Sequence, residues 1–164
     1  MAAANLLKTS YKAPGILIGH SLGGAAVLVA AAKIESVKAV ATVGAPFSPG
    51  HVSHLFKSGI EEINTNGIAE VSIGGRSFTI KKQFLEDIEE TSIHHIVHEL
   101  KKPLLILRLP QDNTVGIKNA AAIYQSAMHP KSFISLDGVD HLLSNVKDSV
   151  YAGQIIATWA KRTI

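Results

Sequence analysis

The fold follows from the sequence GILIGHSLGG at residues 15–24. Its first four residues form a short apolar run after Pro14, which predicts a buried parallel strand. Residues 19–23 then match the pattern G-x-S-x-G, and the apolar run 25–32 that follows predicts a helix buried on all sides. A strand, a tight turn that carries a serine, and a helix therefore follow one another, which favours an α/β fold.

Three further apolar segments predict strands, at Val37–Val43, Leu104–Leu107 and Ser132–Leu136. Apolar residues at helical spacing predict helices within 117–128 and 151–159. Because strands alternate with helices, we expect a parallel sheet with right-handed crossovers. The predicted fold class is α/β, with about four parallel strands and flanking helices.

One segment interrupts this alternation. Residues 47–91 separate the second and third predicted strands, which is far more than a usual connection. They contain a hairpin pattern, Glu70–Ile73 and Arg76–Ile80, joined by Gly74-Gly75, which suits a tight turn. Polar helical segments flank the hairpin. We expect 47–91 to be an inserted cap over the site, where it would exclude water and select substrates.

Composition narrows the function. The chain has 164 residues, enough for one domain, with 46% apolar and 18% charged residues. It has no cysteine, which excludes a thiol nucleophile and disulfides. The net charge of +3 is scattered, so we expect no nucleic-acid partner. No apolar run is long enough for a membrane span or a signal peptide, so we expect no membrane partner and a cytoplasmic protein.

Ser21 is the candidate nucleophile. In the G-x-S-x-G pattern the serine sits on a sharp strand-to-helix turn that exposes its hydroxyl above the sheet. We expect Gly19, His20 and Gly23 to form this nucleophile elbow, with small residues required at both glycines. The helix that follows points its N-terminal N–H groups at a developing oxyanion, and the Leu22 N–H is the expected donor.

A serine hydroxyl needs a general base oriented by an acid. Asp112 follows the third predicted strand at its carboxyl end, and His141 follows the fourth. The order Ser, acid, His along the chain is that of the G-x-S-x-G hydrolases. Asp140 is a competing acid, but a sequence neighbour is poorly placed to orient its own histidine. The predicted triad is therefore Ser21, Asp112 and His141.

Histidines also raise the question of a metal. His94, His95 and His98 lie opposite the apolar side of a predicted helix, and no third ligand accompanies the spacing of His94 and His98. The same holds for His51 and His54. We expect no metal and no cofactor.

These motifs resemble bacterial α/β-hydrolases of the serine aminopeptidase-like, lipase and esterase type. The resemblance is closest to hydrolases that are sometimes fused to an OsmC-like domain, and it runs through the elbow and four further segments: Thr42–Pro46, Lys82–Leu85, Asp112–Ile117 and Asp140–Leu143. It implies that Ser21, Asp112 and His141 form the triad, but it supplies no substrate. Our first hypothesis for the function is a serine hydrolase that cleaves an ester, thioester or amide of a small-molecule acyl substrate through an acyl-enzyme.

The chain also departs from that family. The family's elbow follows the fifth of about eight strands, whereas here it begins at Gly19. We therefore expect a domain, 1–164, that lacks its N-terminal half and the loop that supplies a second oxyanion donor. The mean hydropathy of +0.22 fits uncovered apolar surface. The elbow strand would be an exposed edge open to self-association. The alternative function is a weakly active or inactive fragment that acts at most as a binding or assembly half.

Overall fold

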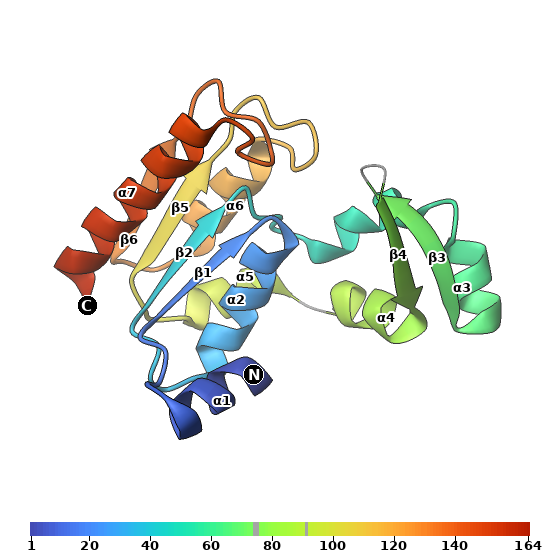
Figure 1. Cartoon of the computed structure of the whole chain (residues 1–164), viewed down its shortest axis with the longest axis horizontal. Coiled ribbons are helices and arrows are strands. Elements are labelled where there is room, and N and C mark those ends of the chain that lie inside the picture. Colours follow the sequence, from blue (N-terminus) through green and yellow to red (C-terminus); the bar gives the residue numbers. More distant parts are fainter. Residues whose placement is uncertain (74–75, 91) are drawn as a thin grey trace. The chain divides into compact units, whose positions relative to one another are not determined.

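The computed structural model describes residues 1–73, 76–90 and 92–164, which form two compact units. The first unit contains Met1–Phe47 and Ile93–Ile164, and the second contains Ser48–Ser92. Figure 1 shows the elements of both.

The first unit is built on a four-stranded parallel sheet, which confirms the predicted fold class. The sheet order is β1-β2-β5-β6, so the strand that precedes Ser21 lies at one edge. The strands are β1 Ile16–His20, β2 Ala39–Val43, β5 Leu104–Arg108 and β6 Lys131–Ser135. Their bounds differ from the predicted ones by one or two residues at most ends, as is usual for element termini.

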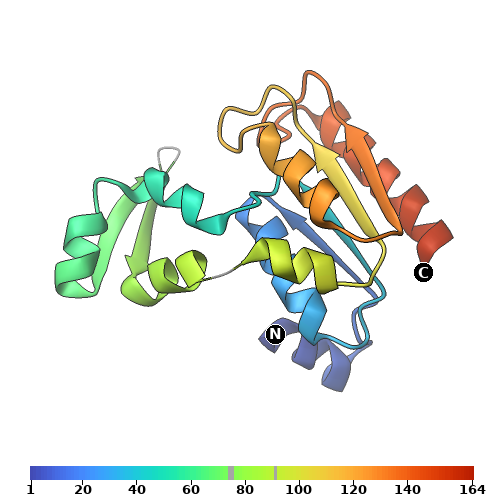
Figure 2. The same ribbon diagram turned by 180° about the vertical axis from the view of Figure 1, so that it is seen from behind.

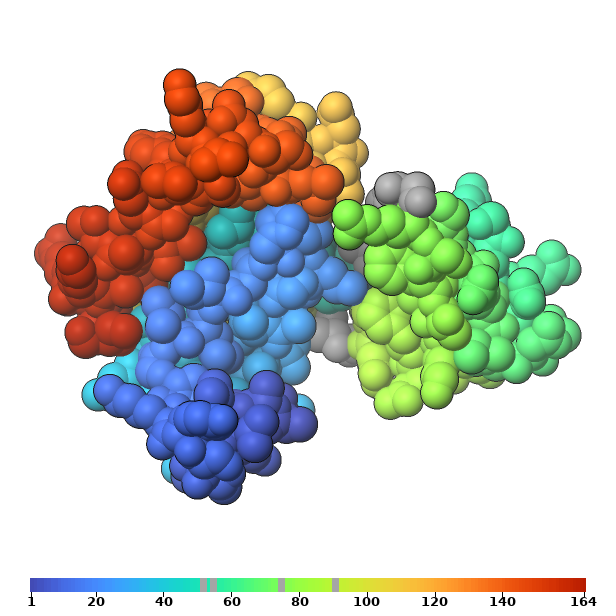
Figure 3. All heavy atoms as spheres, viewed as in Figure 1, coloured from blue at the N-terminus to red at the C-terminus, as the bar shows by residue number. Residues whose placement is uncertain are grey.

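Helices cover both faces of this sheet (Figures 1 and 2). The helices of this unit are α1 Ala2–Ser10, α2 Leu22–Lys33, α5 Ile93–Glu99, α6 Lys118–Ser126 and α7 Val146–Thr163. One core lies between the sheet and helices α2, α5 and α6, and a second lies under α7. Along β5 the side chains alternate between the two cores: Leu104 and Ile106 enter the first, Leu105 and Leu107 the second. Helix α1 has no buried residue and protrudes in Figure 3.

Helix α2 differs from its prediction in burial. It is apolar all round, which predicted a fully buried helix, yet the structure buries one side and leaves Ala26 and Ala32 exposed. The helix packs one face on β1 and β2, and its small alanines leave little apolar surface on the other.

At the C-terminus of α2, the Lys102 ammonium donates hydrogen bonds to the carbonyls of Ala31 at 2.6 Å and Ile34 at 2.9 Å. Burial lowers the pKa of Lys102 from its ordinary value.

The second unit contains an antiparallel hairpin with its own small core. Its elements are the 3-10 helix η1 Pro49–Phe56, α3 Ile60–Asn66, β3 Ile68–Ile73, β4 Arg76–Lys81 and α4 Lys82–Glu90. Strand β3 pairs with β4 from Ile68↔Lys81 to Ile73↔Arg76. Ile63, Ala69 and Val71 are buried. The predicted turn at Gly74-Gly75 lies outside the described residues, and the role of the unit as a cap stays a prediction.

Within the described ranges, no helix combines the length and the apolar character needed to cross a bilayer.

Candidate active site

Ser21 lies on a tight turn between β1 and α2. Its backbone has φ 52° and ψ −131°, a left-handed conformation that residues with a side chain rarely adopt. The Ser21 N–H donates to the carbonyl of Val43 at 2.9 Å, and the Ser21 carbonyl accepts from the Gly24 N–H at 2.8 Å. Backbone strain of this kind costs about 1–3 kcal/mol and persists only where the surrounding structure fixes the conformation. These two hydrogen bonds fix the conformation of Ser21.

The glycines around Ser21 differ in why they are needed. A Cβ on Gly19 would lie 2.3 Å from the carbonyl oxygen of Gly23, and a Cβ on Gly24 would lie 2.5 Å from the Ala45 Cβ. At Gly23 a Cβ would meet no described atom within 4 Å. We expected small residues at Gly19 and Gly23. The crowded positions are instead Gly19 and Gly24, because the side chain of residue 23 would point away from the close approach.

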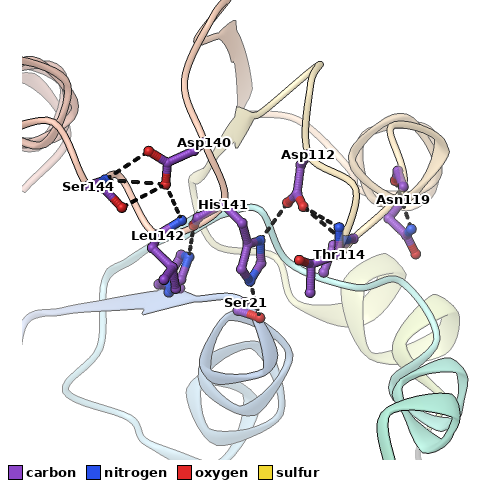
Figure 4. A network of polar contacts seen from close by, with 11 residues as sticks. Ser21, Asp112, Thr114, Asn119, Asp140, His141, Leu142 and Ser144 are labelled. Atoms are coloured by element: carbon purple, nitrogen blue, oxygen red, sulfur yellow. Dashed lines mark hydrogen bonds and ion pairs between the residues drawn. The ribbon is translucent and has the colours of Figure 1, made fainter. Parts of the chain in front are cut away.

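Three side chains from three loops form one hydrogen-bonded series above the sheet (Figure 4). The Ser21 Oγ lies 3.0 Å from His141 Nε2, and His141 Nδ1 lies 2.6 Å from Asp112 Oδ2. The carboxylate accepts, so Nδ1 carries the proton and the Nε2 lone pair faces the serine hydroxyl. The His141 side chain is 15% exposed and that of Asp112 is 1% exposed. The structure thus brings together the three residues singled out in the sequence.

Asp112 is fixed by the loop that follows β5. Its Oδ1 accepts hydrogen bonds from the Thr114 N–H at 2.7 Å and the Val115 N–H at 3.0 Å, which leaves Oδ2 for His141. Gly44, at the end of β2, has φ +53°, and a Cβ there would lie 3.4 Å from Asp112 Oδ2. Thr114, Val115 and Gly44 lie in segments that carry the family resemblance, but the sequence analysis assigned none of them a role at the site.

Asp140, the competing acid, has other partners. Its Oδ1 accepts from the Leu142 N–H at 2.8 Å, and its Oδ2 accepts from the Ser144 N–H at 3.1 Å (Figure 4). Desolvation alone raises the pKa of the Asp140 carboxyl. Hydrogen bonds from Leu142, Leu143 and Ser144 together hold that pKa below its ordinary value. Asp140 therefore fixes the backbone of the His141 loop, while Asp112 orients the imidazole.

His20 and Leu22 flank the serine. Leu22 is the first residue of α2, and its N–H has no acceptor among the residues that the structure describes, as expected in the first turn of a helix. The imidazole of His20 was expected only as part of the turn. Its Nε2 lies 2.6 Å from the carbonyl oxygen of His141, and the two rings lie 4.9 Å apart. No sequence signal predicts this contact.

Five other histidines were considered as metal ligands in the sequence. His94, His95 and His98 are exposed on α5, and the side chains of His51 and His54 lie outside the described residues. The described residues gather no group of three or more side chains that could hold a metal. Two hollows of about 540 and 390 Å³ are lined by residues such as Ser36 and Pro103, which precede strands. They lie at the amino-terminal ends of the parallel strands, whereas Ser21 lies at the carboxyl end of β1.

A parallel sheet with a serine on a strand-to-helix turn, followed along the chain by an acid and a histidine, defines the α/β-hydrolases. Among solved structures, the esterase domain of a Rhodothermus marinus protein matches with 50% sequence identity and a TM-score of 0.87. The match covers 98% of this chain and 66% of that chain. This chain belongs to the α/β-hydrolase superfamily and is homologous to its esterases.

More distant structures share the fold. Est1E from Butyrivibrio proteoclasticus, solved with bound ferulic acid, matches at 18% identity and a TM-score of 0.73, over 98% of this chain and 64% of that one. Alpha/beta hydrolase domain-containing protein 10 from mouse matches at 22% identity and a TM-score of 0.72, over 98% and 67%. The chain thus spans about two thirds of the length of each of these three structures. No protein-family model and no curated protein matches it.

Proposed function

We propose that this chain is a serine hydrolase that cleaves carboxylic esters of small molecules through an acyl-enzyme on Ser21. The observation that carries the proposal is the hydrogen-bonded series from the Ser21 hydroxyl through His141 to Asp112. The 50% identity to an esterase domain supports esters as the bond type. Thioesters and amides react by the same chemistry and are the neighbouring possibilities.

Acylation begins when the Ser21 Oγ attacks the ester carbonyl carbon and its proton moves to His141 Nε2. The carbonyl electron pair moves to oxygen and forms a tetrahedral oxyanion. When this intermediate collapses, the C–O bond to the alcohol breaks, and the alcohol leaves with the proton from His141. Water then attacks the acyl carbon and gives a proton to His141, which returns it to Ser21 Oγ as the acid departs.

Two neighbours assist these steps. Asp112 keeps the His141 proton on Nδ1 and stabilises the imidazolium that forms when Nε2 takes the serine proton. The Leu22 N–H belongs to the residue after Ser21, at the positive end of the α2 dipole, and is the oxyanion donor that we propose.

Two further roles complete the proposal. Residues 47–91 act as a cap that selects the acyl substrate, a role supported by a separately packed unit of nearly the same extent, Ser48–Ser92. The edge strand β1 is an association site for a second copy, because its outer backbone groups have no strand partner in the described sheet.

A fluorophosphonate probe tests the proposal directly, because it phosphonylates an activated serine far faster than an ordinary one. We expect wild-type protein to be labelled at Ser21, as located by peptide mass spectrometry, and to hydrolyse p-nitrophenyl acetate. Ser21→Ala should lose both. Labelling that persists in that variant, or a wild-type protein that is neither labelled nor active, would contradict the proposal. The second result would favour a non-catalytic binding or assembly role.

A further inference from the structure

The loop that carries His141 is held on two sides. On one side, the Asp140 carboxylate accepts from the N–H groups of Leu142 and Ser144. On the other, the His141 carbonyl oxygen lies 2.6 Å from Nε2 of His20, the last residue of β1. Leu143 in the same loop has φ 52°, so the loop is not in a relaxed conformation and depends on such ties.

The direction of the second tie follows from its atoms. A backbone carbonyl only accepts, so His20 Nε2 carries a hydrogen and donates it. The imidazole of His20 also packs against that of His141, with ring centroids 4.9 Å apart and planes inclined by 45°. His20 therefore contacts both the backbone and the ring of His141.

This contact closes a ring of interactions around the candidate nucleophile. His20 and Ser21 are consecutive residues, and both bond to residue 141: His20 to its carbonyl oxygen, Ser21 to its ring nitrogen. The two contacts join residues that lie 121 and 120 positions apart in the sequence. A shift of the His141 loop away from β1 must therefore break the His20 contact as it lengthens the distance from His141 Nε2 to Ser21 Oγ.

We propose that His20 is a positioning residue that holds His141 at proton-transfer distance from Ser21. The proposal rests on the proposed function, because it assigns His141 as the base. Displacement of about 1 Å in a reacting group can cost about 10²-fold in rate. Since Asp140 and Asp112 still hold the loop and ring, we expect a smaller effect, about tenfold in kcat, when the His20 donor is lost.

Two substitutions separate the hydrogen bond from the packing. His20→Phe keeps an aromatic ring and removes the donor, whereas His20→Gln keeps an N–H donor at a similar reach and removes the ring. His95→Phe, at an exposed position on α5, is the matched control. We expect kcat for p-nitrophenyl acetate to fall about tenfold in His20→Phe, with KM little changed, and to recover to within about threefold of wild type in His20→Gln.

The kcat values of these variants show whether the hydrogen bond from His20 positions His141. Equal kcat in wild type and His20→Phe, or a His20→Gln variant as slow as His20→Phe, would overturn the proposal. If His20→Phe does not fold, His20→Met replaces it, because methionine matches glutamine in length without the donor. Fluorophosphonate labelling separates the two proposals. If wild type is labelled at Ser21 and the His20 variants are labelled at the same rate, only the role of His20 is refuted. If wild type is not labelled, the proposed function is refuted.

Discussion

At the scale of single residues, the turn at Ser21 depends on where a methyl group can fit. A Cβ on Gly19 would lie 2.3 Å from a backbone oxygen, which cannot rotate away. We expect Gly19→Ala to lower the free energy of unfolding by about 3 kcal/mol or more. Gly23→Ala is the matched control: its Cβ meets open space in the first turn of α2, and alanine favours a helix by up to about 1 kcal/mol. Urea denaturation measures both. Equal stability of the two variants would contradict the close approach.

The identity of the acid is a second residue-scale prediction. Asp112→Asn keeps the shape of the side chain but lets the amide favour the wrong His141 tautomer. We expect turnover of p-nitrophenyl acetate to fall by about 10⁴-fold, as in serine proteases. Asp140→Asn should have a much smaller effect, because Asp140 bonds to the backbone of the loop. Comparing kcat between the two variants shows which carboxylate is the acid. A larger loss in Asp140→Asn would mean that Asp112 is not the acid.

The three residues of the hydrogen-bonded series could be found in the sequence because each follows a strand in a known order. Ser21 had a five-residue pattern, and Asp112 and His141 had their positions after β5 and β6. The supporting contacts could not be found in this way. The partners of His20 and Gly44 lie far away in sequence, and only the folded chain brings them together.

At the scale of elements, α2 depends on a cap from a distant segment. The Lys102 ammonium donates to the carbonyls of Ala31 and Ile34 at the helix C-terminus. Lys102→Met keeps the apolar stem and removes the charge and the donors, so we expect a loss of about 1 kcal/mol in stability. Lys101→Met, whose side chain is 79% exposed, is the matched control and should change stability little. Thermal unfolding compares the two, and equal Tm values would show that the cap contributes nothing measurable.

The second unit carries a prediction about substrate choice. Ser48–Ser92 has its own buried residues, so replacing it with a short Gly/Ser linker should leave the two cores of the first unit intact. If the unit is a cap, the preference among p-nitrophenyl esters of different acyl length should change, while Ser21 still reacts with a small fluorophosphonate. Unchanged preference across the series would count against a cap.

The elements show which sequence patterns were informative. Short apolar runs predicted all four parallel strands, and two short segments joined by a Gly-Gly pair predicted the hairpin. Helix α3 was not predicted, because its seven residues are too short for a helical period to stand out. The burial of α2 was overestimated, because an alanine-rich helix is apolar on every side whether or not every side is covered.

At the scale of the whole molecule, β1 forms one edge of the four-stranded sheet and has β2 as its neighbour on the other side among the described strands. Ile18 on this strand is 53% exposed. If a second copy pairs with this edge, Ile18→Lys should shift the protein towards monomer, because a charge on an edge strand opposes strand pairing. Val150→Lys, at a position on α7 that is 51% exposed, adds the same charge away from the edge and should leave association unchanged. Sedimentation velocity measures the states, and a wild-type monomer at all concentrations would exclude this association.

The connectivity of the sheet also has a consequence for folding kinetics. Strands β2 and β5 are hydrogen-bonded neighbours, yet all of Ser48–Ser92 lies between them in the chain. Pairing them closes a long loop, whose entropy cost grows roughly as (3/2)RT ln n, whereas β3 and β4 pair locally. Early folding of the hairpin would shorten that loop. Because Asp112 follows β5 and His141 follows β6, the hydrogen-bonded series at Ser21 would then be among the last parts of the protein to form.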